Sequence, residues 1–142
     1  MKKLTLVLAI ALITGFVMAQ KIQSKDVPEA VKAAFKKEFP GVKGTKWDEE
    51  ESNFEASFNN NKSDQSVVFD AEGNILEIEV EIKLSELPKG VMEYVTSTYP
   101  GKKIKEVAKI TDAQKTVTYE VEVSGMDVIF NEQGKFIKEI KG

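Results

Sequence analysis

The chain has 142 residues, a formal net charge of −3, and neither cysteine nor histidine. The absence of both residue types excludes disulfide scaffolds, Cys/His zinc sites, and Ser–His or Cys–His catalytic groups. Every basic residue is lysine, which excludes bidentate guanidinium recognition of carboxylate or phosphate. The acidic balance argues against nucleic acid as a partner.

The first 19 residues have the pattern of a secretory signal peptide. A basic start, Lys2-Lys3, precedes the apolar stretch Leu4–Val17 and a small-residue cleavage site that ends at Ala19. An uncleaved anchor helix is the alternative, but the apolar run is short of the about 20 residues that span a bilayer. We therefore predict a signal peptide over 1–19, no stable membrane span after its cleavage, and a periplasmic or secreted location. Cleavage removes two lysines and no acid, which makes the mature net charge −5.

The first predicted helix follows a short polar lead-in over residues 21–25. It begins near Asp26–Pro28, because aspartate is a good capping residue and proline is tolerated in a first helical turn. Pro40-Gly41 ends it. Apolar residues recur at every fourth position and predict one buried stripe, formed by Val27, Val31, Phe35 and Phe39.

Strands are predicted after this helix. A weak strand over 42–48 contains Trp47, and the acidic run Asp48–Glu51 is interpreted as a turn. Alternation of apolar and polar residues predicts a strand over 54–58, and another over 66–69 precedes a turn at 70–74. The clearest strand is 75–82, in which Leu76, Ile78, Val80 and Ile82 alternate with Glu77, Glu79 and Glu81.

The same pattern then starts again. LPKGVMEYVTSTYPG at 87–101 matches VPEAVKAAFKKEFPG at 27–41, sixty positions earlier, and strands are predicted over 104–110, 117–123, 126–130 and 136–140. A half of about 60 residues buries too little surface to be comfortable alone. We predict an α+β fold in which two tandem helix-plus-about-four-strand repeats, about 26–82 and 86–141, form an antiparallel sheet with the helices on one face. Residues 20–142 are predicted to be a single domain.

The repeated unit resembles the PepSY-like family of small exported bacterial proteins, whose fold is similar to the tandem-repeat fold of the β-lactamase-inhibitor protein. The shared motif stands at Val27–Gly41 with Val67–Gly73, and again at Leu87–Gly101 with Val128–Gly134. The resemblance implies a secreted or periplasmic domain with helices on one side and an open sheet face that binds protein on the other. It implies no catalytic residues.

The glutamates of the predicted sheet are the main candidate site. Alternation places several on one strand face, and neighbouring strands would make that face acidic. Like charges directly opposite destabilise a strand pair, so interleaved lysines such as Lys138, or a partner, are expected. The alternative is an ordinary solvated sheet face. The predicted binding residues are Glu55, Glu77, Glu79, Glu81, Glu120 and Glu122.

Other candidates are weaker. Asp70, Glu72 and Asn74 have the spacing of a Ca²⁺ half-site, but their counterparts Asn131, Gln133 and Lys135 keep the turn and lose the charge, which favours turn geometry. Trp47 is either a binding anchor or, as its counterpart Val107 suggests, a core residue.

Paired carboxylates could also serve glycoside hydrolysis, but no aromatic-rich sugar platform accompanies them. We predict an exported, non-catalytic binding or regulatory module that has no cofactor and recognises an unidentified exported or envelope protein. A periplasmic Ca²⁺-binding protein that uses acidic turns is the alternative.

Overall fold

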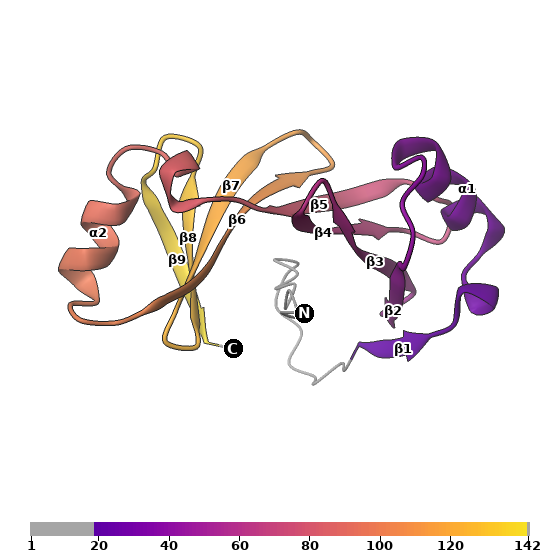
Figure 1. Cartoon of the computed structure of the whole chain (residues 1–142), viewed down its shortest axis with the longest axis horizontal. Coiled ribbons are helices and arrows are strands. Elements are labelled where there is room, and N and C mark those ends of the chain that lie inside the picture. The colour runs from indigo at the N-terminus through magenta and orange to yellow at the C-terminus, as the bar shows by residue number, and fades with distance from the viewer. Residues whose placement is uncertain (1–18, 142) are drawn as a thin grey trace. The chain divides into compact units, whose positions relative to one another are not determined.

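The computed structural model describes residues 19–141, so the predicted signal peptide over 1–19 lies outside the described residues except for Ala19. Strands and two α-helices make up the described part of the chain, and the strands follow chain order in the sheet from β1 to β9 (Figure 1). The α+β class and the antiparallel pairing of strands are confirmed. Between residues 19 and 141, no helix is long and apolar enough to cross a membrane.

The chain divides into two compact units between Ile78 and Glu79, inside strand β5. The first unit begins with β1 (Gln20–Ile22), a 3₁₀ turn (Ser24–Asp26) and helix α1 (Glu29–Glu38). It continues with β2 (Lys46–Glu50), β3 (Asn53–Asn60), β4 (Ser63–Phe69) and the start of β5 (Ile75–Glu81).

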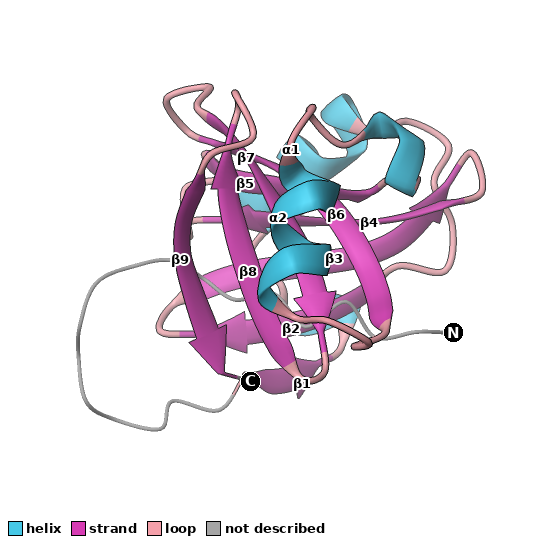
Figure 2. Ribbon diagram, turned by 90° about the vertical axis from the view of Figure 1, so that its left-hand side faces the viewer, coloured by secondary structure: helices cyan, strands magenta, loops and turns pink. Residues whose placement is uncertain are grey.

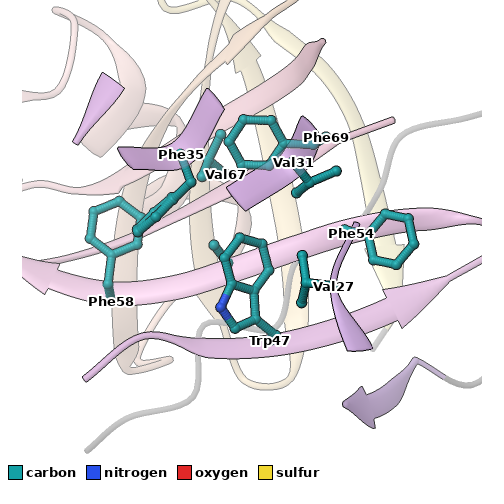
Figure 3. Packing of buried hydrophobic residues seen from close by; sticks show 9 residues of the cluster. Val27, Val31, Phe35, Trp47, Phe54, Phe58, Val67 and Phe69 are labelled. Carbon is teal, nitrogen blue, oxygen red and sulfur yellow. The ribbon is translucent and has the colours of Figure 1, made fainter. Parts of the chain in front are cut away.

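Helix α1 and the strands of the first unit share a core that is rich in aromatic residues, and Figure 3 shows how these side chains pack. The Phe35 ring centre lies 5.4 Å from that of Trp47 and 5.1 Å from that of Phe58, and both pairs meet edge to face. This is the geometry that aromatic pairs prefer. The predicted stripe is confirmed, since Val27, Val31 and Phe35 are buried and Phe39 packs against them.

The second unit repeats the order of elements. A 3₁₀ turn (Leu84–Glu86) and helix α2 (Val91–Thr98) precede β6 (Ile104–Asp112), β7 (Val117–Val123), β8 (Met126–Asn131) and β9 (Phe136–Lys141). Figure 2 shows α2 in front of the strands, and its Val91 and Val95 pack against a valine-rich core from β6, β7 and β8. At the end of α2, the Tyr99 hydroxyl donates to Glu139 of β9 at 2.5 Å, which raises the pKa of Tyr99 to about 12.

A glycine turn packs onto the first helical turn in each unit. Gly73 has a φ of +87°, and a Cβ built there would lie 2.6 Å from the Ala30 carbonyl oxygen of α1. Gly134 has a φ of +79°, and its Cβ would lie 2.7 Å from the Lys89 carbonyl oxygen just before α2. Positive φ and close backbone approach both require glycine, which explains why the motif ends in this residue.

Three local predictions are wrong. The polar lead-in contains strand β1, whose three residues pair with β2. Asp26 lies in a 3₁₀ turn and caps no α-helix, because α1 begins at Glu29. The acidic run is strand rather than turn over Asp48–Glu50. The turn that follows uses Glu51 and Ser52, both at positive φ.

Candidate functional site

The strand face opposite the helix carries a group of carboxylates in the first unit. In the register, Asp48 of β2 lies directly opposite Glu55 of β3, which in turn lies opposite Val68 of β4. Glu50 shares the face of Asp48 because it stands two residues later. Glu77 of β5 acts on Glu55 electrostatically. We call these four residues, Asp48, Glu50, Glu55 and Glu77, the first acidic cluster.

Glu55 has a strongly raised pKa in this cluster. Burial is the main cause that raises its pKa to about 7, and the charges of Asp48, Glu50 and Glu77 add to the effect. The nearby Ser66 hydroxyl opposes the shift. Neither Glu55 Oε1 nor Ser66 Oγ has a hydrogen-bond partner of good geometry. Ser66 itself is fully buried. Glu55 is therefore a carboxyl group that changes its charge near neutral pH.

A second row of acids crosses three strands of the second unit. Glu106 of β6 lies opposite Glu122 of β7, which lies opposite Asp127 of β8. We call these three residues the second acidic cluster. Lys105 Nζ lies 2.9 Å from Glu122 Oε1 and partly neutralises the row. Burial and the Glu122 charge raise the pKa of Asp127, whereas Lys105 lowers it.

The six predicted binding residues differ in their exposure. Glu55, Glu77, Glu81 and Glu122 are half-buried. Glu79 and Glu120 are 1% and 7% exposed, so the expectation of a solvated ladder is wrong for these two. The structure brings Glu55 and Glu77 together in the first cluster and places Glu122 in the second.

Apolar side chains share this strand face, which sequence reasoning missed. Val68, Ala108 and Ile129 are buried although they lie opposite the helix-covered face, and Glu120 stands between Ala108 and Ile129 in the register. The sequence feature that could have predicted this burial is the continuous apolar run in two strands, Val67-Val68-Phe69 and Val128-Ile129-Phe130. Such runs are typical of strands that are buried on both faces. Lys138, expected to offset the glutamates, lies opposite Ile129, and Lys105 takes that role at Glu122.

The predicted Ca²⁺ half-site is a hydrogen-bonded turn. Asp70 Oδ1 accepts from the backbone N–H groups of Glu72 and Asn74 at 3.0 and 2.9 Å, and Oδ2 accepts from Asn74 Nδ2 at 2.8 Å. The bonds from Asn74 are the main cause that lowers the pKa of Asp70. Asn131, a neutral residue, accepts the equivalent backbone bonds at 3.0 and 2.9 Å. Over the described range 19–141, no three acidic residues are grouped so that they could hold a metal ion.

The interpretation of Trp47 as a core residue is confirmed. Its side chain is 6% exposed and packs in the aromatic core under α1. It is therefore a reporter of the first unit's core rather than a surface anchor.

Comparison with known proteins identifies the class. The sequence profile of the family described as "Putative beta-lactamase-inhibitor-like, PepSY-like" matches residues 17–77 and 52–138. The chain has the α+β, inhibitor-like fold of this class, and it belongs to the PepSY-like family. No curated protein matches the sequence.

Solved structures of Bacteroides proteins share the fold. A "BLIP-like protein" of Bacteroides fragilis is similar with 25% identity and a TM-score of 0.66, over 80% of this chain and 85% of that one. A DUF2874 family protein of Bacteroides uniformis has 25% identity and a TM-score of 0.72, over 80% and 88%. A protein of Bacteroides eggerthii, described as a "putative periplasmic" protein, has 19% identity and a TM-score of 0.74, over 80% and 88%.

Proposed function

We propose that this protein is an exported, non-catalytic binding module that recognises a basic surface of an envelope or periplasmic protein through the half-buried acids of the strand face opposite its helices, which include Glu77, Glu81 and Glu122. The observation that carries the proposal is the pairing of like charges in register. Asp48 faces Glu55, and Glu106 faces Glu122, which faces Asp127. Like charges directly opposite destabilise a sheet, and Lys105 offsets part of that cost at Glu122. A cationic partner would offset the remainder.

The family supports a binding role rather than catalysis. Its description is inhibitor-like, and the Bacteroides fragilis structure is described as BLIP-like. The sequence offers neither histidine nor cysteine for acid–base or nucleophilic chemistry. The periplasmic description of the Bacteroides eggerthii protein and the predicted signal peptide support an extracytoplasmic location.

We also infer that the two units are tandem repeats within one domain. The aromatic residue before Pro-Gly donates its backbone N–H to Phe35 in the first unit at 2.8 Å and to Val95 in the second at 2.9 Å. Gly73 and Gly134 occupy corresponding turns against the start of each helix. Strand β5 crosses the division between the units, which supports their folding together.

Charge reversal on the strand face tests the proposed function. Proteins captured from an envelope extract are identified by mass spectrometry, and their affinity for purified variants is then measured. Glu77→Lys/Glu81→Lys should weaken binding about tenfold or more, since it opposes the partner's positive charge. The neutral pair Glu77→Gln/Glu81→Gln, which perturbs the half-buried positions less, should weaken binding to a smaller extent.

The matched control makes the same change in net charge at exposed positions on the helices. Glu38 and Glu93 are exposed on α1 and α2, so Glu38→Lys/Glu93→Lys alters net charge equally without touching the strand face. This control should bind like the unmodified protein and show the same melting temperature. Equal binding by the control and strand-face variants would refute the proposed face.

The Ca²⁺ alternative has its own measurement. Both carboxylate oxygens of Asp70 accept hydrogen bonds within the turn. We therefore expect no heat of binding and no shift in melting temperature at millimolar Ca²⁺. An increase in melting temperature with Ca²⁺ that Asp70→Asn abolishes would establish the alternative. Asn131 accepts the equivalent backbone bonds, so asparagine at position 70 should preserve the turn.

A further inference from the structure

We propose that Glu55, with the buried Ser66 beside it and three carboxylates around it, is a proton-sensitive position: the first unit is tightly packed when Glu55 is neutral, and ionisation of Glu55 loosens strands β2, β3 and β4. The proposal concerns the stability of the first unit and is independent of any partner.

The register of β2 and β3 brings two carboxyl groups close together. Asp48 and Glu55 are directly opposite in a β2–β3 pair that also holds Trp47 opposite Ala56 in the core. Directly opposed side chains in an antiparallel pair lie about 4.5–5.5 Å apart at Cβ, so two ionised carboxylates there repel each other. Neutral Glu55 removes that repulsion and can donate a hydrogen bond from its carboxyl O–H.

Ser66 is a buried polar residue close to Glu55. It is 0% exposed on β4, and neither its hydroxyl nor Glu55 Oε1 makes a hydrogen bond of good geometry, although the hydroxyl lies near enough to the carboxyl group to lower its pKa. A poorly formed hydrogen bond between two buried polar groups is costly. The hydroxyl therefore stabilises an ionised Glu55 only in part, and the charge remains poorly solvated, whereas a neutral Glu55 carries no such charge.

The other charged groups on this face do not reverse the argument. Glu50 on β2 and Glu77 on β5 are acidic and oppose ionisation of Glu55. Lys21 on β1 lies opposite Asp48, and Lys46 stands two residues before Asp48; both lysines are exposed. On β4, Asp64 shares the face of Ser66 and accepts a hydrogen bond from Asn59.

The direction of the pH effect follows from linkage. Burial and the neighbouring charges raise the folded-state pKa of Glu55 from 4.5 to about 7. The stability contributed by the neutral group is therefore complete below about pH 4.5 and is lost as the pH rises through about 7. Between about pH 6 and about pH 8, the opening equilibrium of the first unit should increase about tenfold.

Hydrogen exchange of residues 46–69, corrected for the intrinsic chemical rate, measures this opening at the two pH values. The unmodified protein should open about tenfold more at the higher pH, and Glu55→Gln, a neutral isostere, should remove most of this dependence. Glu38→Gln is the matched control because Glu38 is exposed on α1, and it should keep the tenfold change. Equal pH dependence in the unmodified protein and Glu55→Gln would overturn the proposal.

Carbon-13 NMR of the Glu55 side-chain carboxyl tests the proposal in the unmodified protein, so the result does not depend on whether a variant folds. A titration midpoint near 7 supports the proposal, and a midpoint below about 5, close to that of a free glutamate, overturns it. Ser66→Ala should move the midpoint upward, because the hydroxyl lowers the pKa of Glu55.

Discussion

Replacing Gly73 by alanine should destabilise the protein by about 2–4 kcal/mol. Alanine at a φ of +87° incurs the left-handed strain of an L-residue, and its Cβ would lie 2.6 Å from the Ala30 carbonyl oxygen. This oxygen belongs to the backbone of α1, so it cannot rotate away as a side chain could. Chemical denaturation, followed by circular dichroism, measures the change in the free energy of unfolding.

Gly44→Ala separates the two causes. Gly44 has a φ of +73°, similar to that of Gly73, but a Cβ there would meet nothing within 4 Å. Gly44→Ala should therefore lower the free energy of unfolding by only about 1–2 kcal/mol, which is the cost of placing alanine at positive φ. In the second unit, Gly134 has the close contact and Gly125 has open space, so the same difference is expected there. Equal losses at Gly73 and Gly44 would show that the turn can move away from α1.

The elements with a strong period could be predicted from the sequence. Apolar residues recur at every fourth position in each helix and at every second position in β3, and both patterns predict one buried face. The structure buries the predicted residues Val31, Phe35, Phe54 and Phe58. The motif glycine was also recognisable as a turn residue. Its packing against the helix was not, because a contact between segments over forty residues apart leaves no local pattern.

Elements without a period were missed. Strand β1 has three residues, too few to show alternation, and its existence depends on pairing with β2. The acidic run resembles a solvated turn locally, but Trp47 must reach the core, and the strand that carries it extends through Glu50. Here tertiary packing overrides the low strand propensity of consecutive acids.

The candidate site was predicted only in outline. Alternation predicted that Ile78 and Ile82 face the core, and the structure packs both against the cores. It could not show that Glu79 is buried or that Asp48 faces Glu55, because burial and register depend on neighbouring strands. The perturbed group, Glu55, is therefore visible only in the folded chain.

The largest loss of stability is expected at the centre of the first core. Phe35 is 8% exposed and packs edge to face with both Trp47 and Phe58. Truncation removes its transfer free energy and leaves a cavity, so Phe35→Ala should destabilise by about 3–5 kcal/mol. Val95, which is 2% exposed in the second core, loses less volume, and Val95→Ala should cost about 1–3 kcal/mol.

The same pair of variants tests whether the chain is one domain. Trp47 fluorescence reports only the first core, whereas far-ultraviolet circular dichroism reports the helices and strands of both units. Strand β5 supplies Ile78 to the first core and leads directly to Ile82 in the second, so disorder in one unit should release the strand from the other. Val95→Ala should therefore shift the fluorescence and dichroism transitions together, as a two-state domain requires. A dichroism transition that moves while the Trp47 transition stays in place would identify two independent folding units joined by β5.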